Sequence, residues 1–316
     1  MPHMVDISIV IPLKNEQNNV MALYRELTSA LATQDKSYEI IMIDDGSTDQ
    51  TFKILKEIHE KDKKVKVIRF KKNFGQTAAL SAGFNLARGE IIITMDGDLQ
   101  NDPNDIPLLL ERLDEGYDIV SGWRYKRKDP FISRRLPSMV ANYLISLITK
   151  VRLHDYGCTL KAFRKDVIKN INLYGEMHRF IPAIASWMGV SVTEIKVNHR
   201  PRIHGSSKYG ISRTLRVFLD LLTVKFLLSY STKPIHIFGL IGLIIGGIGF
   251  CFAVYLAFIK LVYGYNIGNR PLLLLAILLI IIGVQFITIG LLAEIQTRAY
   301  YELQRKPTYV IQEMLE

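Results

Sequence analysis

Two carboxylates stand two positions apart in the stretch TMDGDLQ, residues 94–100, which follows the apolar run EIII. Side chains at positions i and i+2 of a strand point to the same side, so Asp96 and Asp98 are expected to converge where a buried strand ends, unless a kink at Gly97 turns them. Adjacent carboxylates raise the cost of ionising each other unless they share a proton or bind a cation. The pair therefore predicts an acid/base pair or a divalent-cation site, and oxygen-only ligands favour Mg²⁺ or Mn²⁺.

A second acidic turn, DDGSTD at residues 44–49, favours the cation site. Ser47 or Thr48 would suffice to cap the helix that follows, so capping leaves three aspartates unexplained. The chain has no glycine-rich fingerprint of a dinucleotide or P-loop site. A bound nucleotide would therefore be held by carboxylates and a metal ion, with the cation on the diphosphate.

Strand-like and helix-like segments alternate over residues 6–125. Apolar runs predict strands at 7–12, 38–44, 65–70 and 90–96, and helical patterns predict helices at 18–32, 51–61 and 76–87. Strands that lack polar alternation and are joined by helices are typical of a parallel sheet covered on both faces. Ligands of such sheets bind beyond the carboxyl ends of the strands, where both acidic turns lie.

Two long apolar runs lie near the C-terminus. Residues 235–259 and 271–293 contain no Asp, Glu, Lys or Arg. A helix of about 20 residues spans the roughly 30 Å hydrocarbon core, so each run is long enough. A core helix of a soluble protein is the alternative, but helices that are apolar all round are rare outside membranes. We therefore expect two transmembrane helices.

The charges beside these runs predict the topology. Basic residues are more frequent outside the hairpin than in its loop: Lys208, Arg213, Arg216, Lys225, Lys233, Arg298, Arg305 and Lys306 against Lys260 and Arg270. The positive-inside rule then places both termini and the large N-terminal part of this multi-pass protein in the cytoplasm. No secretory signal precedes the first strand, and two cysteines give no disulfide framework.

The remaining segments complete the expected domain organisation. Arg213, Arg216, Asp220 and Thr223 share one helical face in an otherwise apolar stretch, which favours a helix in the membrane interface over a core helix. The expected parts are an N-terminal α/β domain at 1–210, an amphipathic juxtamembrane helix at 211–232, a transmembrane hairpin at 233–295 and a cytoplasmic tail at 296–316. The net charge of +10 comes without a nucleic-acid motif, and basic residues cluster toward the membrane segments, so we expect no nucleic-acid partner.

Five motifs in fixed order carry a family resemblance: IVIPLKNE, IDDGSTD, MDGDLQ, SGWRY and GSSK. Together they resemble the family 2 glycosyltransferases of GT-A fold. More narrowly, they resemble the polyprenyl-phosphate glycosyltransferases, such as dolichol-phosphate mannose synthase and the bacterial bactoprenol glucosyltransferases. The resemblance covers about residues 5–210, and a two-span C-terminus matches the bacterial branch. It implies an α/β catalytic domain with a Rossmann-like, mostly parallel sheet.

The resemblance assigns one group of residues to the nucleotide-sugar donor. The implied donor-site residues are Pro12, Glu16, Asp44, Asp45, Asp96, Gln100, Arg202 and Lys208. Asp44 and Asp45 would contact the uridine or its ribose. Asp96, Asp98 and Gln100 match the family's D-x-D-x-Q motif for the metal ion and the diphosphate. Lys14 stands where many relatives carry Tyr, which leaves base stacking at that position open.

A second group is assigned to the sugar and the lipid acceptor. Asp155 matches an aspartate that relatives place near the transferred sugar, and with Asp98 and Arg124 it forms the implied catalytic set. The implied contacts of the acceptor phosphate are Arg134, Ser138 and Ser207. A surface or lipid-headgroup role is the alternative for Arg134, as an interfacial anchor is for Lys208.

The implied reaction is an inverting displacement in which a phosphate oxygen of polyprenyl (undecaprenyl) phosphate attacks the anomeric carbon of a UDP-sugar. A phosphate monoester has a second pKa of about 6 and is largely ionised at neutral pH, so it needs no general base. Asp155 would then orient a substrate or stabilise oxocarbenium-like charge. The metal ion would act as a Lewis acid on the leaving diphosphate. Glucose is the favoured sugar, with GDP-mannose or an aminosugar donor as the alternative.

Two rival functions are weaker on the sequence. A processive polysaccharide synthase of this fold carries a Q-x-x-R-W motif, but neither Trp123 nor Trp187 follows an arginine. A non-catalytic membrane scaffold would have no reason to keep Asp96, Asp98 and Asp155. The resemblance also implies a homo-oligomer, and Gly242, Gly246, Gly247 and Gly249 would permit close helix packing.

Overall fold

The structure is a computed structural model, and its contacts divide the chain into two compact units. One unit comprises Met1–Val224 with Pro307–Glu316, and the other Lys225–Lys306. The described residues are 5–125, 142, 145, 146, 149, 151–171, 173, 177–186, 188–201, 235–268, 270–303 and 309–316. Arg134, Ser138, Arg202, Ser207, Lys208 and the predicted juxtamembrane helix at 211–232 lie outside them.

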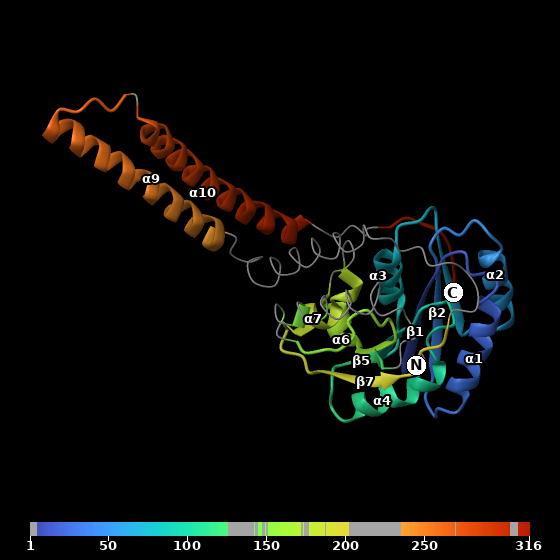
Figure 1. Ribbon diagram of the computed structural model, residues 1–316. Helices are drawn as coiled ribbons and strands as arrows, with labels where there is room; N and C mark the ends of the chain where they lie inside the picture. Colours follow the sequence, from blue (N-terminus) through green and yellow to red (C-terminus); the bar gives the residue numbers. More distant parts are fainter. Residues whose placement is uncertain are drawn as a thin grey trace. The chain divides into compact units, whose positions relative to one another are not determined.

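The first unit is built on an eight-stranded sheet of order β7-β5-β6-β4-β1-β2-β3-β8 (Figure 1). The strands are β1 Ile7–Leu13, β2 Tyr38–Asp44, β3 Val65–Phe70, β4 Ile91–Thr94, β5 Ile119–Arg124, β6 Lys161–Arg164, β7 Val192–Val197 and β8 Ile311–Leu315. β6 runs antiparallel to β4 and β5, and β8 antiparallel to β3, while the other neighbours are parallel. The expected mostly parallel sheet of GT-A type is confirmed.

Helices cover both faces of the sheet because alternate strand residues feed two separate cores. On β1, Ile9 and Ile11 pack into one core and Val10 into the other. The first face carries α1 Val20–Ala32, α2 Thr51–Lys61 and α4 Ile106–Asp114, preceded by the short helix η1 Pro103–Asp105. The second face carries α3 Gln76–Leu86, α6 Lys165–Lys169 and α7 Ile181–Ser186, preceded by η3 Met177–Arg179.

The strands and helices predicted up to residue 94 are confirmed, with a difference at the acidic pair. β4 ends at Thr94, so Asp96 and Asp98 lie in a turn and not on the strand. The main-chain N–H of Asp96 donates to Asn101 Oδ1 (3.1 Å), and Leu99 adopts a left-handed φ of 62°. The side chain of Asn101 thus closes the turn by a hydrogen bond to the main chain of Asp96. The alternation of side chains along a strand therefore does not set the directions of the two carboxylates.

A C-terminal strand that the sequence did not reveal closes one edge of the sheet. β8 pairs with β3, and Tyr309 just before it stacks on Phe70 with ring centroids 5.1 Å apart. Asn85 Nδ2 donates to the Tyr309 hydroxyl (3.0 Å). An unpaired sheet edge invites association with other chains, so β8 protects the edge that β3 would otherwise expose.

We expect Tyr309→Ala to destabilise this unit, because it removes the stacked ring and the Asn85 hydrogen bond. Aromatic pairs contribute about 0.5–1.5 kcal/mol beyond their buried area, so the midpoint of thermal unfolding should fall by several degrees. Tyr309→Phe keeps the stacking and should lose less than half as much. An unchanged midpoint in Tyr309→Ala would show that the contacts of Tyr309 with Phe70 and Asn85 add nothing to stability.

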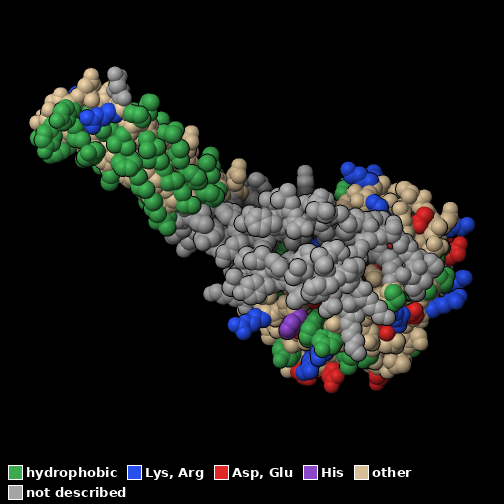
Figure 2. Space-filling model, viewed as in Figure 1, with side chains coloured by type: hydrophobic (Ala, Val, Ile, Leu, Met, Phe, Trp, Pro, Cys, Tyr) green, Lys and Arg blue, Asp and Glu red, His purple; other side chains and the backbone are tan. Residues whose placement is uncertain are grey.

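The second unit is a pair of apolar helices, α9 Ile235–Tyr263 and α10 Pro271–Leu303. Figure 2 shows green hydrophobic side chains over the pair, and Leu261 and Leu274 are 84% and 73% exposed. Windows of both helices are long and apolar enough to cross a membrane, at Phe238–Tyr263 and Pro271–Ala293. Gly242 packs so closely on Gly283 that a Cβ atom would lie 2.6 Å from the Gly283 carbonyl oxygen. Part of the predicted glycine stripe therefore serves packing within the hairpin.

Candidate active site

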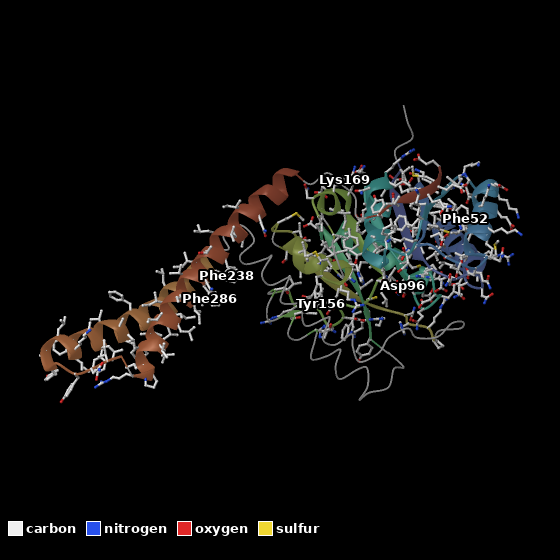
Figure 3. All side chains as sticks on the ribbon, turned by 90° about the horizontal axis from the view of Figure 1, so that it is seen from above. Phe52, Asp96, Tyr156, Lys169, Phe238 and Phe286 are labelled. Carbon is white, nitrogen blue, oxygen red and sulfur yellow. The ribbon has the colours of Figure 1, made fainter. Side chains whose placement is uncertain are left out.

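The Asp96 carboxylate is held by two side chains from other elements. Gln76 Nε2, at the start of α3, donates to Asp96 Oδ1 (2.8 Å). Thr159 Oγ1, just before β6, donates to Asp96 Oδ2 (2.5 Å). The sheet order places β6 directly beside β4, so residues far apart in sequence meet at this turn. Asp96 is labelled in Figure 3.

Asp98 is the second carboxylate of the turn and is 7% exposed. Burial and the charge of Asp98 raise the pKa of the Asp96 carboxyl above its usual value. A cation beside the pair would offset this repulsion, so the donor set suits a hard divalent ion. Over the described parts of the chain, no cluster of three or more His, Cys, Asp or Glu side chains surrounds such a position. Substrate phosphate oxygens and water would have to complete the coordination.

Gln100 connects this turn to the segment after β7. Its main-chain N–H donates to Asp98 Oδ1 (3.2 Å), and its carbonyl accepts the N–H of Arg200 (2.9 Å). Arg200 in turn contacts Glu26 on α1 (2.6 Å) and Asp102 (2.8 Å). Arg200, two residues before Arg202, therefore links the predicted metal-binding turn to α1 by a hydrogen bond and two ion pairs.

The other acidic turn lies at the carboxyl end of β2, and both of its first carboxylates are buried. Asp44 is 0% exposed; its Oδ1 accepts the Ser47 N–H (2.9 Å) and its Oδ2 lies 3.6 Å from Arg69 Nε. Asp45 accepts the N–H groups of Phe74 (2.7 Å) and Gly75 (3.0 Å). Burial is the main cause that raises the pKa of Asp45. In this structure both carboxylates shape the loops around the predicted nucleotide site.

Pro12 lies near the end of β1, and the loop after this strand carries Glu16 and is tied to the second acidic turn. Asn15 donates its N–H to Ser47 Oγ (2.9 Å) and accepts the Thr48 N–H on its side-chain oxygen (2.9 Å). The N–H of Glu16 donates to Thr51 Oγ1 (2.9 Å). The two loops predicted to hold the nucleoside are thus brought together, whereas their contact with a nucleoside stays a prediction.

Arg124 and Asp155, predicted separately, form one ion pair. Arg124 Nε and Nη2 donate to the two oxygens of Asp155 at 2.7 and 2.9 Å, the fork geometry of a strong charge-assisted pair. The side chains are 16% and 3% exposed. Gly157 also donates its N–H to Asp155 Oδ1 (3.1 Å). These hydrogen bonds occupy most of the lone pairs of the Asp155 carboxylate. Asp155 therefore suits orientation and charge stabilisation better than proton transfer.

Sequence reasoning missed Thr159 and Lys161, which approach the site from β6. Lys161 is 3% exposed and donates to the carbonyl oxygens of Tyr156 (3.3 Å) and Cys158. Burial lowers the pKa of Lys161, and the same burial raises the pKa of the Cys158 thiol to about 11. A lysine inside an apolar strand pattern is the available signal, because such a charge is rarely buried without a role.

Residues 8–171 match the family described as Glycosyl transferase family 2. The whole chain also aligns with dodecaprenyl-phosphate galacturonate synthase of Rhizobium johnstonii, at 44% identity over 99% of this chain and 94% of that protein. The chain belongs to glycosyl transferase family 2. A second member of the family, undecaprenyl-phosphate 4-deoxy-4-formamido-L-arabinose transferase of Edwardsiella ictaluri, is 37% identical over 98% of this chain and 94% of that protein.

Solved structures agree with the fold of this family 2 glycosyltransferase. Glucosyl-3-phosphoglycerate synthase from Mycobacterium tuberculosis, in complex with Mn²⁺, UDP and glucosyl-3-phosphoglycerate, superposes with a TM-score of 0.55. The match covers 71% of this chain and 80% of that chain at 16% identity. At that identity the likeness concerns the fold, which confirms the expected GT-A architecture.

Proposed function

We propose that this glycosyltransferase transfers a sugar from a UDP-sugar to polyprenyl phosphate at the cytoplasmic face of a membrane. The anomeric C–O bond to UDP breaks, a bond from that carbon to the acceptor phosphate oxygen forms, and UDP leaves. The single observation that carries the proposal is the convergence of the Asp96–Asp98 turn and the Arg124–Asp155 pair around Thr159 and Gly157. Relatives named for polyprenyl-phosphate sugar transfer align with nearly the whole chain and support it.

Asp96 and Asp98 are the residues proposed to hold a divalent ion, with Gln100 beside them. When bound, Mg²⁺ or Mn²⁺ would supply Lewis-acid stabilisation of the leaving diphosphate. Gln76 and Thr159 fix the orientation of the Asp96 carboxylate. A solved relative in fold carries Mn²⁺ with UDP, which supports the choice of metal and nucleotide class without deciding between Mg²⁺ and Mn²⁺.

The Arg124–Asp155 pair is proposed to position the acceptor phosphate and the sugar. An ionised phosphate monoester needs no proton removed, so the occupied lone pairs of Asp155 are no obstacle to the reaction. Arg124 keeps its charge under all relevant conditions, and the pKa of its guanidinium is raised further by Asp155. Arg134, Ser138 and Ser207 remain proposed contacts of the acceptor phosphate, and Arg202 and Lys208 of the donor phosphates.

We rank the candidate donor sugars in a different order from the one that the sequence alone favoured. The two relatives above are named for galacturonate and for a formamido-arabinose, so they lend no support to glucose. We place UDP-galacturonate first, followed by UDP-glucose and other hexoses, with aminosugar donors and GDP-mannose after them. The reason is the 44% identity to the galacturonate synthase over almost the full length.

The lipid acceptor accounts for the second unit. A polyprenyl chain stays in the bilayer, and the exposed apolar surface of α9 and α10 suits insertion beside it. We propose that both helices span a bacterial inner membrane, with the catalytic unit and both termini in the cytoplasm. Because β8 follows α10 and joins the sheet of the catalytic unit, the two ends of the hairpin lie on one side in this proposal. A homo-oligomer also remains part of the proposal.

The test is transfer by the purified full chain in detergent, with undecaprenyl phosphate, Mn²⁺ or Mg²⁺ and a panel of nucleotide sugars. We expect a lipid-linked sugar whose mass corresponds to the polyprenyl phosphate plus one sugar residue, and loss of the product on chelation with EDTA that excess metal restores. UDP affinity measured by calorimetry should likewise fall at least tenfold without metal. Metal-independent UDP binding with no product from any donor would instead favour a non-catalytic scaffold.

A further inference from the structure

A small cavity lies beside the turn that carries Asp96 and beside Asp155, the two acidic parts of the candidate active site. Its wall includes Gly157, Thr159, Lys161, His178 and Arg179. Thr159 donates its hydroxyl to Asp96, and Gly157 donates its main-chain N–H to Asp155. The cavity therefore borders the region between the proposed diphosphate site and the proposed acceptor site, where the donor sugar has to lie.

Lys161 gives this cavity a buried positive charge. Its ammonium group has three donors, and among the described residues its acceptors are two main-chain carbonyls, those of Tyr156 and Cys158. Carbonyl dipoles solvate a cation but do not neutralise it. The nearby charges of Asp155 and Asp96 favour the protonated ammonium group, and the third N–H of Lys161 has no acceptor among the described residues. An anion in the cavity would supply that acceptor.

Arg179 adds a second cation to the same wall, and its neighbour His178 orients it. His178 Nδ1 lies 2.7 Å from Thr77 Oγ1, and Arg179 Nε donates to His178 Nε2 at 3.4 Å. Because Nε2 accepts the hydrogen bond from Arg179, Nδ1 carries the proton and donates to the threonine. The histidine ties Arg179 to α3, while Lys161 comes from β6.

We propose that this basic wall binds an acidic substituent of the donor sugar, the C6 carboxylate of a hexuronic acid. The inference rests on the proposed function and deepens it, because it names Lys161 and Arg179 as residues that determine donor specificity. A carboxylate that accepts charge-assisted hydrogen bonds from two cations is held about twice as strongly as a neutral hydroxyl. The acceptor phosphate is the other anion that reaches the active site, so the test has to separate the two sources.

UDP-galacturonate and UDP-galactose form a matched pair, since they differ only at C6. We expect the full-length protein to use UDP-galacturonate with a kcat/KM at least tenfold above that for UDP-galactose. Arg179→Met should lower this ratio at least tenfold, and Lys161→Met likewise if the variant folds. Lys161→Arg keeps the charge and should preserve the ratio. The control is Lys169→Met, an exposed lysine on α6 (Figure 3), which should change neither rate.

The outcomes distinguish the inference from the function on which it rests. A protein that transfers galactose as well as galacturonate, or whose ratio stays constant in Arg179→Met and Lys161→Met, overturns the carboxylate site and leaves the glycosyltransferase proposal intact. Equal losses for both donors would assign the basic wall to the acceptor phosphate and also overturn the inference. A protein that makes lipid-linked sugar from no UDP-sugar at all refutes the proposed function, and the inference with it.

Discussion

Asp98→Asn is expected to reduce sugar transfer about a hundred- to a thousandfold, the usual effect of removing one element of transition-state charge stabilisation. The change keeps the size of the side chain and removes one of two carboxylates proposed to bind the metal ion. The Gln100 N–H that donates to Asp98 Oδ1 keeps an acceptor in the asparagine. Stability should therefore change little while transfer is lost.

Two controls make this prediction specific to the metal site. Asp114→Asn removes a carboxylate whose side chain is 64% exposed and which forms a surface ion pair with Lys36, so transfer and unfolding temperature should match the wild type. A second readout is the rise in unfolding temperature that UDP with Mn²⁺ produces, which Asp98→Asn should abolish. Near-normal turnover in Asp98→Asn, or an undiminished metal-dependent rise, would contradict the assignment.

Asp155→Asn should have the largest combined effect on stability and activity. The substitution leaves the Arg124 guanidinium buried without its counter-charge, and breaking a buried ion pair from one side costs about 3–5 kcal/mol. Transfer should fall about a hundredfold or more, because Arg124 loses the fork geometry that orients it toward the substrates. Unfolding temperature and kcat of the same preparation would be measured together.

A double-mutant cycle separates the structural role of this pair from its role in transfer. Arg124→Met alone leaves Asp155 unpaired, whereas Arg124→Met with Asp155→Asn removes both charges. The double variant should recover part of the lost stability but none of the lost transfer. Recovery of transfer in the double variant would mean that the pair only holds the fold. Loss of stability in the single variants without coupling between them would mean that the ion pair is not formed in solution.

Local patterns in the sequence were enough to predict the framework of the site. The apolar runs gave β1 to β4, and the acidic turns at Asp44–Asp49 and Asp96–Gln100 lie at the carboxyl ends of β2 and β4 as parallel-sheet geometry requires. These features depend on residues close in sequence and on one rule of sheet topology. The family resemblance supplied the order of the motifs and the GT-A fold.

Contacts between distant segments could not be predicted in the same way. Arg124 and Asp155 are 31 positions apart and meet because β5 and the turn before β6 lie side by side. Thr159 reaches Asp96 across 63 positions, and apart from the buried Lys161 the TLKAF stretch carries no signal of an active-site segment. β8 follows the apolar hairpin in the sequence and pairs with β3, which lies more than 200 residues before it. Its role is therefore set by a partner that its own sequence does not specify.

Asp96 and Asp98 lie close together as expected, but a turn rather than strand alternation brings them together. Asp96 and Asp98 do come close enough to affect each other, as the pKa of Asp96 indicates. The cause is a turn closed by Asn101 and a left-handed Leu99, two features of the loop rather than of the strand. Strand alternation would have carried both carboxylates in one fixed direction, whereas in the turn Gln76 and Thr159 orient Asp96, and the Gln100 N–H contacts Asp98.

The most direct measurement is a crystal of the full chain grown with Mn²⁺ and UDP, with diffraction data collected at the manganese absorption edge. We predict an anomalous difference peak in contact with a carboxylate oxygen of Asp96 or Asp98 and with the diphosphate of UDP. UDP bound at the carboxyl ends of β1 and β2 with no anomalous peak at that turn would contradict it.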